Sequence, residues 1–113
     1  MSCLFCKIIA KEMAASIIFE DAHLIAINDI QPQAPVHVLI IPKEHIATIN
    51  HIDENHAQLC GNMIMRAKIL ANENDISENG YRLVFNVNDG GGQTIHHVHL
   101  HLLGGRQMVW PPG

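Results

Sequence analysis

Three histidines alternate with aliphatic residues in one run of the chain, His97-Val98-His99-Leu100-His101-Leu102-Leu103. Side chains on a β-strand point alternately to its two faces, so a strand over this run carries imidazoles on one face and apolar groups on the other. Successive imidazoles on that face would lie roughly 6.6 Å apart along the strand. One phosphate-sized group could then contact the middle imidazole and a neighbour together, which favours phosphoryl chemistry.

The histidine run (residues 97–103) admits three interpretations. Solvent-facing histidines without a function are the least favoured, because Ser, Thr or Lys would serve a strand surface better. A zinc site is a serious rival, since imidazole is a common zinc ligand and a His-x-His pair can chelate from one strand. The third is covalent catalysis, in which a neutral imidazole attacks phosphorus and water later resolves the nucleotidyl-histidine. A neighbouring imidazole would then deliver a proton to a departing amine.

A glycine-rich segment, Gly90-Gly91-Gly92-Gln93-Thr94, lies just before the histidine run. Glycines allow positive φ and let backbone N–H groups approach an anion closely, so this segment is interpreted as a phosphate cradle. A flexible turn is the alternative for a glycine triplet taken alone. Thr94 could donate its hydroxyl to the phosphate or to a leaving group, or simply lead into a strand.

The hydrophobic pattern around these segments predicts an α+β fold, with a five-stranded antiparallel sheet, one long helix covering one face and a short N-terminal helix. The two prolines of residues 29–35 indicate an ordered extended loop, able to position a side chain such as Asp29. A two-residue hairpin loop is predicted at Asp21-Ala22. Helices are expected over residues 3–10 and 54–72, and strands over residues 16–20, 23–28, 36–41, 81–87 and 97–103.

The long helix should begin after Asp53, a suitable N-cap, and bury an apolar stripe with three- and four-residue spacing. Cys60 and Ile64 would widen this stripe, so Cys60 is interpreted as a core residue. His37 begins the strand over residues 36–41, and taken alone it would be a hydrogen-bonded structural histidine.

Length and composition narrow the class of protein. The 113 residues predict one domain over residues 1–113, and the 48% hydrophobic content predicts a globular core. A formal charge of -4 argues against a basic nucleic-acid-binding surface. We expect a cytoplasmic protein with no membrane partner, because the chain has neither a membrane-spanning run nor the order of a signal peptide. The three cysteines are then thiols or metal ligands rather than disulfides.

The histidine run resembles the signature of the histidine triad family, His-φ-His-φ-His-φ-φ with φ an apolar residue. The resemblance covers essentially the whole chain and is closest to the Hint branch, the nucleoside phosphoramidases. The other segments that carry it are Phe5-Cys6-Lys7-Ile8-Ile9, Phe19-Glu20-Asp21, Asp29-Ile30-Gln31-Pro32-Gln33-Ala34-Pro35, Ile41-Pro42-Lys43, Gly91-Gly92-Gln93, Gly104-Gly105-Arg106-Gln107-Met108 and Trp110-Pro111-Pro112-Gly113.

The resemblance implies a homodimer in which two five-stranded sheets join, and in which the C-terminal tail, residues 104–113, reaches toward the partner's active site. It implies hydrolysis of the P–N bond of a purine nucleoside 5′-phosphoramidate, or of an aminoacyl-adenylate, through a covalent nucleotidyl-histidine. AMP or GMP would be released, and the reaction would require no metal cofactor. The alternative is a nucleotide-binding scaffold that performs little catalysis.

The resemblance also implies roles for individual residues. His99 is the nucleophile and His101 a phosphate contact and proton handler. His97 and His37 complete the catalytic cluster, with His37 helping to protonate the leaving amine. The implied nucleotide-binding residues are Asn86, Gly92, Gln93 and Thr94 for the phosphate, Asp29 and Asn28 for the ribose, Leu4, Phe5, Ile8, Ile27 and Ile30 for the base, and Trp110 from the partner subunit.

A subset of the family binds structural zinc through a Cys-x-x-Cys motif and two histidines. The implied ligands here are Cys3, Cys6, His45 and His97, a set suited to tetrahedral zinc. The alternative is two reduced thiols beside a short helix. His97 is thus claimed both by the catalytic cluster and by the zinc site.

Overall fold

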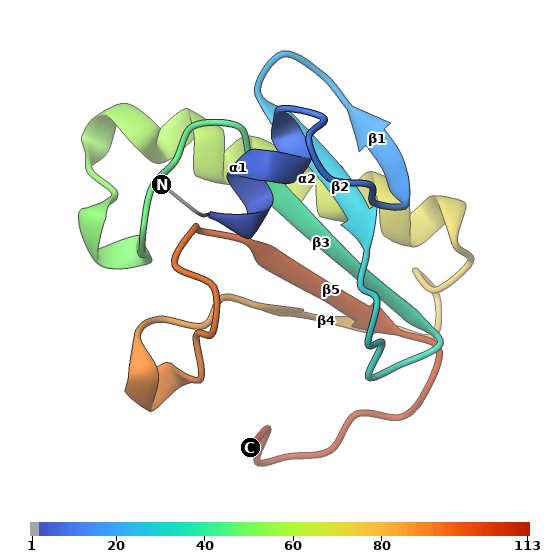
Figure 1. Ribbon diagram of the computed structural model, residues 1–113. Helices are drawn as coiled ribbons and strands as arrows, with labels where there is room; N and C mark the ends of the chain where they lie inside the picture. Colours follow the sequence, from blue (N-terminus) through green and yellow to red (C-terminus); the bar gives the residue numbers. More distant parts are fainter. Residues whose placement is uncertain (1–2) are drawn as a thin grey trace.

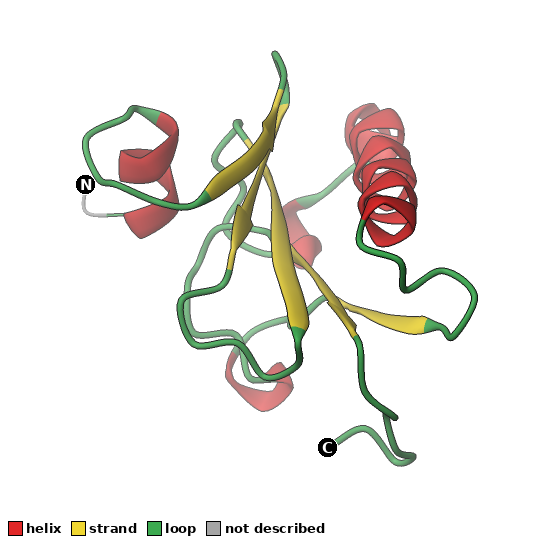
Figure 2. Ribbon diagram, turned by 90° about the vertical axis from the view of Figure 1, so that its right-hand side faces the viewer, coloured by secondary structure: helices red, strands yellow, loops and turns green. Residues whose placement is uncertain are grey.

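The computed structural model describes residues 3–113 and has the predicted α+β architecture. One antiparallel sheet has the strand order β1-β2-β3-β5-β4, and the helices α1 and α2 lie on its opposite faces (Figure 1; Figure 2). No helix within residues 3–113 is long and apolar enough to cross a membrane. The elements are α1 Leu4–Ile9, β1 Ile17–Glu20, β2 Leu24–Asn28, β3 Val36–Pro42, α2 Ala57–Glu73, β4 Tyr81–Val84, β5 Leu100–Gly104 and three short 3-10 turns, Ile49–His51, Glu54–His56 and Asp89–Gly91.

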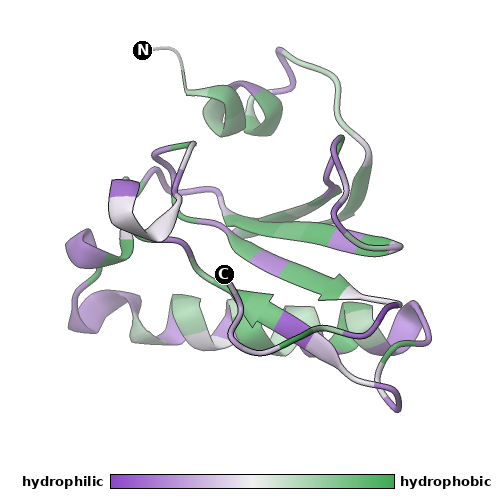
Figure 3. Ribbon diagram, turned by 90° about the horizontal axis from the view of Figure 1, so that it is seen from below, coloured by the Kyte–Doolittle hydropathy of each residue, from purple (hydrophilic) through white to green (hydrophobic). Residues whose placement is uncertain are grey.

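The central strand β3 is buried from both sides, and its residues alternate between two apolar clusters. Val38 and Ile40 pack in the cluster beneath α2, whereas Leu39 and Ile41 pack in the cluster beneath α1. This alternation is what a strand buried on both faces requires. Figure 3 shows the strands of the sheet mainly in hydrophobic colours, with isolated hydrophilic positions along them.

The helix α2 begins three residues later than predicted. Asp53 caps the 3-10 turn Glu54–His56, where its carboxylate accepts from the backbone N–H of Asn55 at 2.8 Å. The α-helix starts only at Ala57. The prediction that Cys60 and Ile64 belong to the core is wrong, because α2 packs over β3 and β5 and leaves Cys60 half-buried and Ile64 48% exposed.

The β1–β2 connection is also longer than predicted. It has three residues rather than two, and the Asp21 carboxylate accepts from the N–H groups of both His23 and Leu24 at 2.8 Å. This side-chain turn stabilises the loop without the glycine that a two-residue turn prefers.

The ladder of β5 begins at Leu100, so His97, Val98 and His99 precede the strand that was predicted to contain them. Continuing the β3–β5 register places Pro42 opposite Val98, and proline has no N–H to donate. The N–H of Val98 instead donates to the carbonyl of Ile46 at 2.7 Å. The side chains still alternate, because Val98, Leu100 and Leu102 are all buried in the cluster beneath α2.

Candidate active site

The His99 imidazole has one nitrogen occupied and one free. Its Nδ1 lies 2.8 Å from the backbone carbonyl oxygen of His97. A carbonyl only accepts, so Nδ1 carries the proton and Nε2 of the neutral ring keeps its lone pair. The ring is 8% exposed and stands 4.9 Å, centroid to centroid, from the ring of His101. An unprotonated nitrogen of this kind is the atom that a nucleophilic histidine needs.

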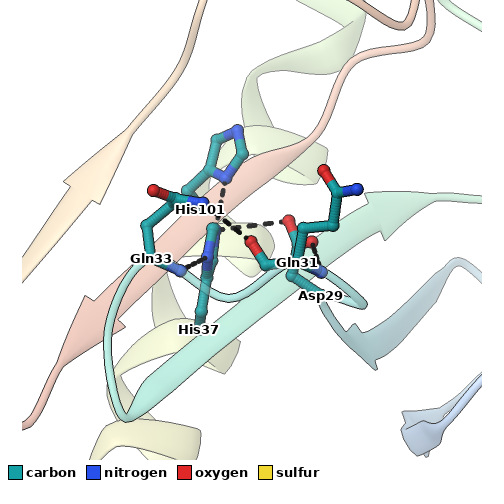
Figure 4. A network of polar contacts seen from close by, with 5 residues as sticks. All are labelled: Asp29, Gln31, Gln33, His37 and His101. Atoms are coloured by element: carbon teal, nitrogen blue, oxygen red, sulfur yellow. Dashed lines mark hydrogen bonds and ion pairs between the residues drawn. The ribbon is translucent and has the colours of Figure 1, made fainter.

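His37 and His101 form a hydrogen-bonded pair that a backbone N–H orients (Figure 4). The N–H of Gln33 donates to His37 Nδ1 at 3.0 Å, so the proton of neutral His37 is on Nε2. That Nε2–H donates to His101 Nδ1 at 2.9 Å, which leaves the proton of neutral His101 on its own Nε2. Asp29 Oδ2 lies 3.5 Å from His37 Nε2, while Asp29 Oδ1 accepts from the N–H of Gln31.

Burial keeps these imidazoles neutral. It lowers the pKa of His37 and of His99 below the ordinary value of 6.5, and the negative charge of Asp29 acts in the opposite direction on both. Burial together with the neighbouring rings of His99 and His37 lowers the pKa of His101 to about 4. At pH 7 the site therefore offers an unprotonated ring nitrogen on His99 and an Nε2–H donor on His101, with no imidazolium until an anion stabilises one.

The His97 ring belongs to a different group of side chains. It is fully buried, and its Nε2–H donates to the carbonyl of Pro42 at 2.8 Å. Its Nδ1 therefore keeps the lone pair, and that atom lies 3.4 Å from Cys3 Sγ and 3.6 Å from Cys6 Sγ. The ring of His97 thus lies with the cysteines, while its backbone carbonyl contacts His99; its part in the catalytic cluster stays a prediction.

The geometry of Cys3, Cys6, His45 and His97 fits a metal ion. One donor atom from each residue lies within 4.8 Å of all the others. His45 Nδ1 is 3.3 Å from Cys6 Sγ and 3.1 Å from His97 Nδ1. Tetrahedral zinc, with bonds of about 2.0 Å to nitrogen and about 2.3 Å to sulfur, has donor–donor edges of about 3.3–3.8 Å. A metal-binding histidine usually donates its other ring N–H to an acceptor, and the Pro42 carbonyl is that acceptor for His97.

A second group of potential ligands, Asp29, His37 and His101, does not fit an ion. The N–H of Gln33 needs the lone pair on His37 Nδ1, so an ion on Nε2 would require a doubly deprotonated ring. The tautomers thus make this group a hydrogen-bonded relay.

In the glycine segment, predicted to cradle a phosphate, three backbone N–H groups already have partners within the loop. The segment forms a 3-10 turn in which the N–H of Gly91 donates to Asn88 and that of Gly92 donates to Asp89. The N–H of Gln93 donates to the Asn88 carbonyl as well. Gly92 is needed because its φ is +78°, in the left-handed region.

The Gln93 and Asn86 side chains, predicted to contact phosphate, hold the loop in place. Gln93 is 5% exposed, and its oxygen accepts from the N–H of Asn88 at 2.9 Å. Its nitrogen donates to the carbonyls of Ala47 and Ile95. The amide of Asn86 donates to the glycine turn at 2.7 Å. The sequence did not predict these hydrogen bonds because the partners of both side chains are backbone groups, which every residue carries.

The residues predicted for the base divide into core and surface. Phe5, Ile8 and Ile27 are at most 5% exposed and belong to the cluster beneath α1. Leu4 is 37% exposed and Ile30 88% exposed.

Asn28, predicted beside the ribose, is exposed and its amide donates to Ser16 Oγ at 2.9 Å. Thr94 is exposed and lines a surface depression with Leu4, Cys3, His45, Ala47, Ile95 and His96.

A cleft of about 460 Å³ opens beside the paired imidazoles, between the sheet and the C-terminal tail. His37 and His101 line it together with Asn86, Arg82 and Arg106. The Arg82 guanidinium donates to the carbonyl of Val109 at 2.7 Å, so the tail is tied to β4 of its own chain. Trp110 is 84% exposed.

Comparisons with known proteins extend over nearly the whole chain. A family model described as "Scavenger mRNA decapping enzyme C-term binding" matches residues 2–109. The chain is 46% identical to the purine nucleoside phosphoramidase of Escherichia coli K12, over 93% of this chain and 88% of that protein. It is 44% identical to the 14 kDa zinc-binding protein of Zea mays, over 97% of this chain and 87% of that protein. A crystal structure of a HIT family hydrolase from Legionella pneumophila Philadelphia 1 is 60% identical, covers 99% of this chain and 100% of its own, and superposes with a TM-score of 0.98.

Proposed function

Because the chain belongs to the histidine triad family of hydrolases, we propose that it cleaves the P–N bond of purine nucleoside 5′-phosphoramidates. The observation that carries the proposal is the free Nε2 of His99, whose Nδ1–H is held by the His97 carbonyl. The purine nucleoside phosphoramidase relative supports the same substrate class. Aminoacyl-adenylates present the same phosphorus centre and are included in the proposal.

The first chemical step forms a covalent adduct. His99 Nε2 attacks phosphorus on the side opposite the leaving amine, a new P–N bond forms to the imidazole, and the bond to the amine breaks. The amine leaves only when its nitrogen takes up a proton, because an amide anion is a very poor leaving group. The nucleoside monophosphate then remains on His99.

The His37–His101 pair supplies that proton. The negative charge of a bound phosphate raises the pKa of His101 from its low value in the free site, so a proton from solvent enters with the substrate. His101 passes this proton to the leaving nitrogen, and the Asp29 carboxylate beside His37 stabilises the transient charge. In the second step the pair accepts a proton from water as the water attacks phosphorus and AMP or GMP leaves.

The proposal places the nucleoside on the exposed residues of the site. Asp29 Oδ2 is the oxygen that could accept from the ribose hydroxyls, because Oδ1 already accepts from Gln31. Leu4 and Thr94 share a surface depression and would contact the base and the phosphate.

The proposal includes a homodimer that joins two sheets through β4. This strand is the last one in the sheet order, and its four residues are only half-buried. The exposed Ile64 and the half-buried Cys60 on α2 are further apolar side chains that the core of a single chain leaves uncovered. A second copy would cover this surface and place residues 104–113, with the exposed Trp110, near the partner's site.

The proposal also includes structural zinc on Cys3, Cys6, His45 and His97, which the donor spacing and the zinc-binding relative support. When bound, the ion would cross-link α1 to the segments that follow β3 and precede β5.

Hydrolysis of a fluorogenic adenosine phosphoramidate tests the proposed function. We expect multiple turnover by the purified chain and a loss of at least about 10³-fold in kcat/KM for His99→Ala. AMP binding without turnover above background would contradict the proposal and favour the scaffold alternative. Equal turnover by the parent and His99→Ala would contradict the proposed nucleophile.

A further inference from the structure

Phe5 links the cysteine cluster to the reactive histidine. It lies on α1 between Cys3 and Cys6, and its side chain is 2% exposed. The edge-to-face contact with the His97 ring has a centroid distance of 5.8 Å, and that with the His99 ring has one of 5.1 Å. A single buried ring thus contacts one member of each histidine group.

The orientation of His99 depends on groups that belong to the cysteine cluster. Its Nδ1–H donates to the backbone carbonyl of His97, and Phe5 packs edge-on against its ring. His97 is itself fixed through Nε2 by Pro42 and through Nδ1 by the cluster. One group that orients His99 therefore belongs to His97, a proposed metal ligand. The other is Phe5, which lies in the sequence between two more of them.

The helix α1 is too short to hold Phe5 in place by itself. It has six residues, and isolated helices of this length are unstable in water. Within the described chain it is anchored by the burial of Phe5 and Ile8 and by its N-cap, where Cys3 Sγ accepts from the N–H of Cys6 at 3.4 Å. An ion bound to Cys3 and Cys6 would replace this weak cap with two strong bonds.

We propose that Phe5 is a positioning residue for His99, and that a zinc ion on Cys3, Cys6, His45 and His97 fixes the His99 imidazole through Phe5 and the His97 carbonyl. This inference rests on the proposed function and deepens it by giving the metal site control over the rate of adduct formation. The ion takes no part in the reaction itself. Loss of the ion or of the Phe5 ring leaves Nε2 imperfectly aimed at phosphorus, and misplacement of a reacting group lowers kcat more than it lowers binding.

The test compares zinc-loaded Phe5→Leu with zinc-loaded parent and with zinc-loaded Ile25→Val. Leucine keeps the site apolar and removes the flat ring edge. Ile25 is fully buried in the same cluster but lies on β2, two strands away from β5, so Ile25→Val controls for general loosening of the core. Zinc content is measured in each sample, and the parent is also examined after chelation.

Three readouts separate positioning from stability and from binding. For Phe5→Leu we expect single-turnover adduct formation to slow about 10- to 100-fold, while KM and the Kd for AMP change less than about 3-fold. In ¹⁵N NMR of the histidine rings, His99 of the loaded parent should show one protonated Nδ1. The same signals should average between the two tautomers in Phe5→Leu and in the chelated parent.

The proposal is overturned if Phe5→Leu keeps the parental adduct rate and NMR pattern, or if Ile25→Val loses as much as Phe5→Leu. It is also overturned if chelation leaves the tautomer of His99 unchanged. A parent that forms no adduct at all would refute the proposed function instead, and the NMR comparison would still decide the positioning role.

Discussion

Two groups of histidines lie on the α1 side of the sheet, and they expose opposite ring nitrogens. His97 donates through Nε2 to the carbonyl of Pro42, so its free lone pair is on Nδ1 and faces two sulfur atoms. His99, two residues further on, donates through Nδ1 to the carbonyl of His97, so its free lone pair is on Nε2. The backbone partner of each imidazole thus decides which nitrogen is available and, with it, whether the ring suits a metal or a phosphorus atom.

The largest expected effect comes from removing one imidazole of each group. His99→Ala should lose at least about 10³-fold in kcat/KM and keep one zinc per chain, because the ring contributes no metal ligand. His97→Ala should lose the zinc and a large part of the stability, since it removes a ligand and leaves a cavity in a fully buried position. Metal analysis, thermal unfolding and kinetics on the two proteins would check the separation. The separation of His97 and His99 into a metal-binding and a catalytic group is contradicted if both variants lose zinc or if neither does.

Removal of one thiolate should affect stability next most strongly. Cys6→Ser is expected to abolish stoichiometric zinc and lower the Tm by at least about 10 °C, because binding of structural zinc contributes directly to folding. Cys60→Ser is the matched control, as Cys60 lies on α2 outside the cluster. Equal Tm values for the two variants would refute the structural metal site.

Loss of His37 should cost less than loss of the nucleophile. His37→Gln removes the partner of His101 and should lower kcat about 10- to 100-fold for a phosphoramidate of an alkyl amine. The effect should shrink for an aryl amine, which leaves more easily without a proton. His23→Gln is the control, because His23 is exposed in the β1–β2 loop. A loss that is the same for both amines would contradict the proposed proton transfer.

The smallest expected effect is on the pH dependence of stability. Burial lowers the pKa of His37 and brings that of His101 from 6.5 to about 4, so the unfolded chain binds more protons than the folded chain between these values. The stabilisation of the folded chain by the neutral His37 and His101 rings is therefore complete above about pH 6.5 and is lost as the pH falls toward 4. We expect the Tm to fall between pH 7 and pH 5, and to fall less in His101→Gln. An equal fall in both proteins would show that other groups dominate.

The sequence predicted the fold better than it predicted the contacts of the proposed site residues. Alternation in the histidine run correctly separated apolar from imidazole positions, even though His97 and His99 precede the ladder of β5. It could not rank the imidazoles, because the carbonyls of His97 and Pro42 and the N–H of Gln33 select the tautomers, and every residue type carries such groups. The glycine segment, predicted to offer its N–H groups to phosphate, uses three of them within its own turn.

The buried side chains show the same limit. Phe5 was assigned to a base pocket by resemblance, yet its ring lies beneath the surface and contacts two histidines distant in sequence. Gln93 was assigned to phosphate, yet its amide bridges three backbone groups. The pairing of the two cysteines with His45 and His97 depended on the resemblance, since 39 and 91 residues separate Cys6 from these partners.

Mapping the covalent intermediate tests the central claim most directly. The chain would be mixed with a ³²P-labelled adenosine phosphoramidate, quenched within one turnover and digested. Mass spectrometry of the labelled peptide would identify the modified residue, and NMR would identify the modified ring nitrogen. The account predicts AMP on Nε2 of His99 and no label in His99→Ala. Label on His101, on His97 or on Nδ1 of His99 would contradict it.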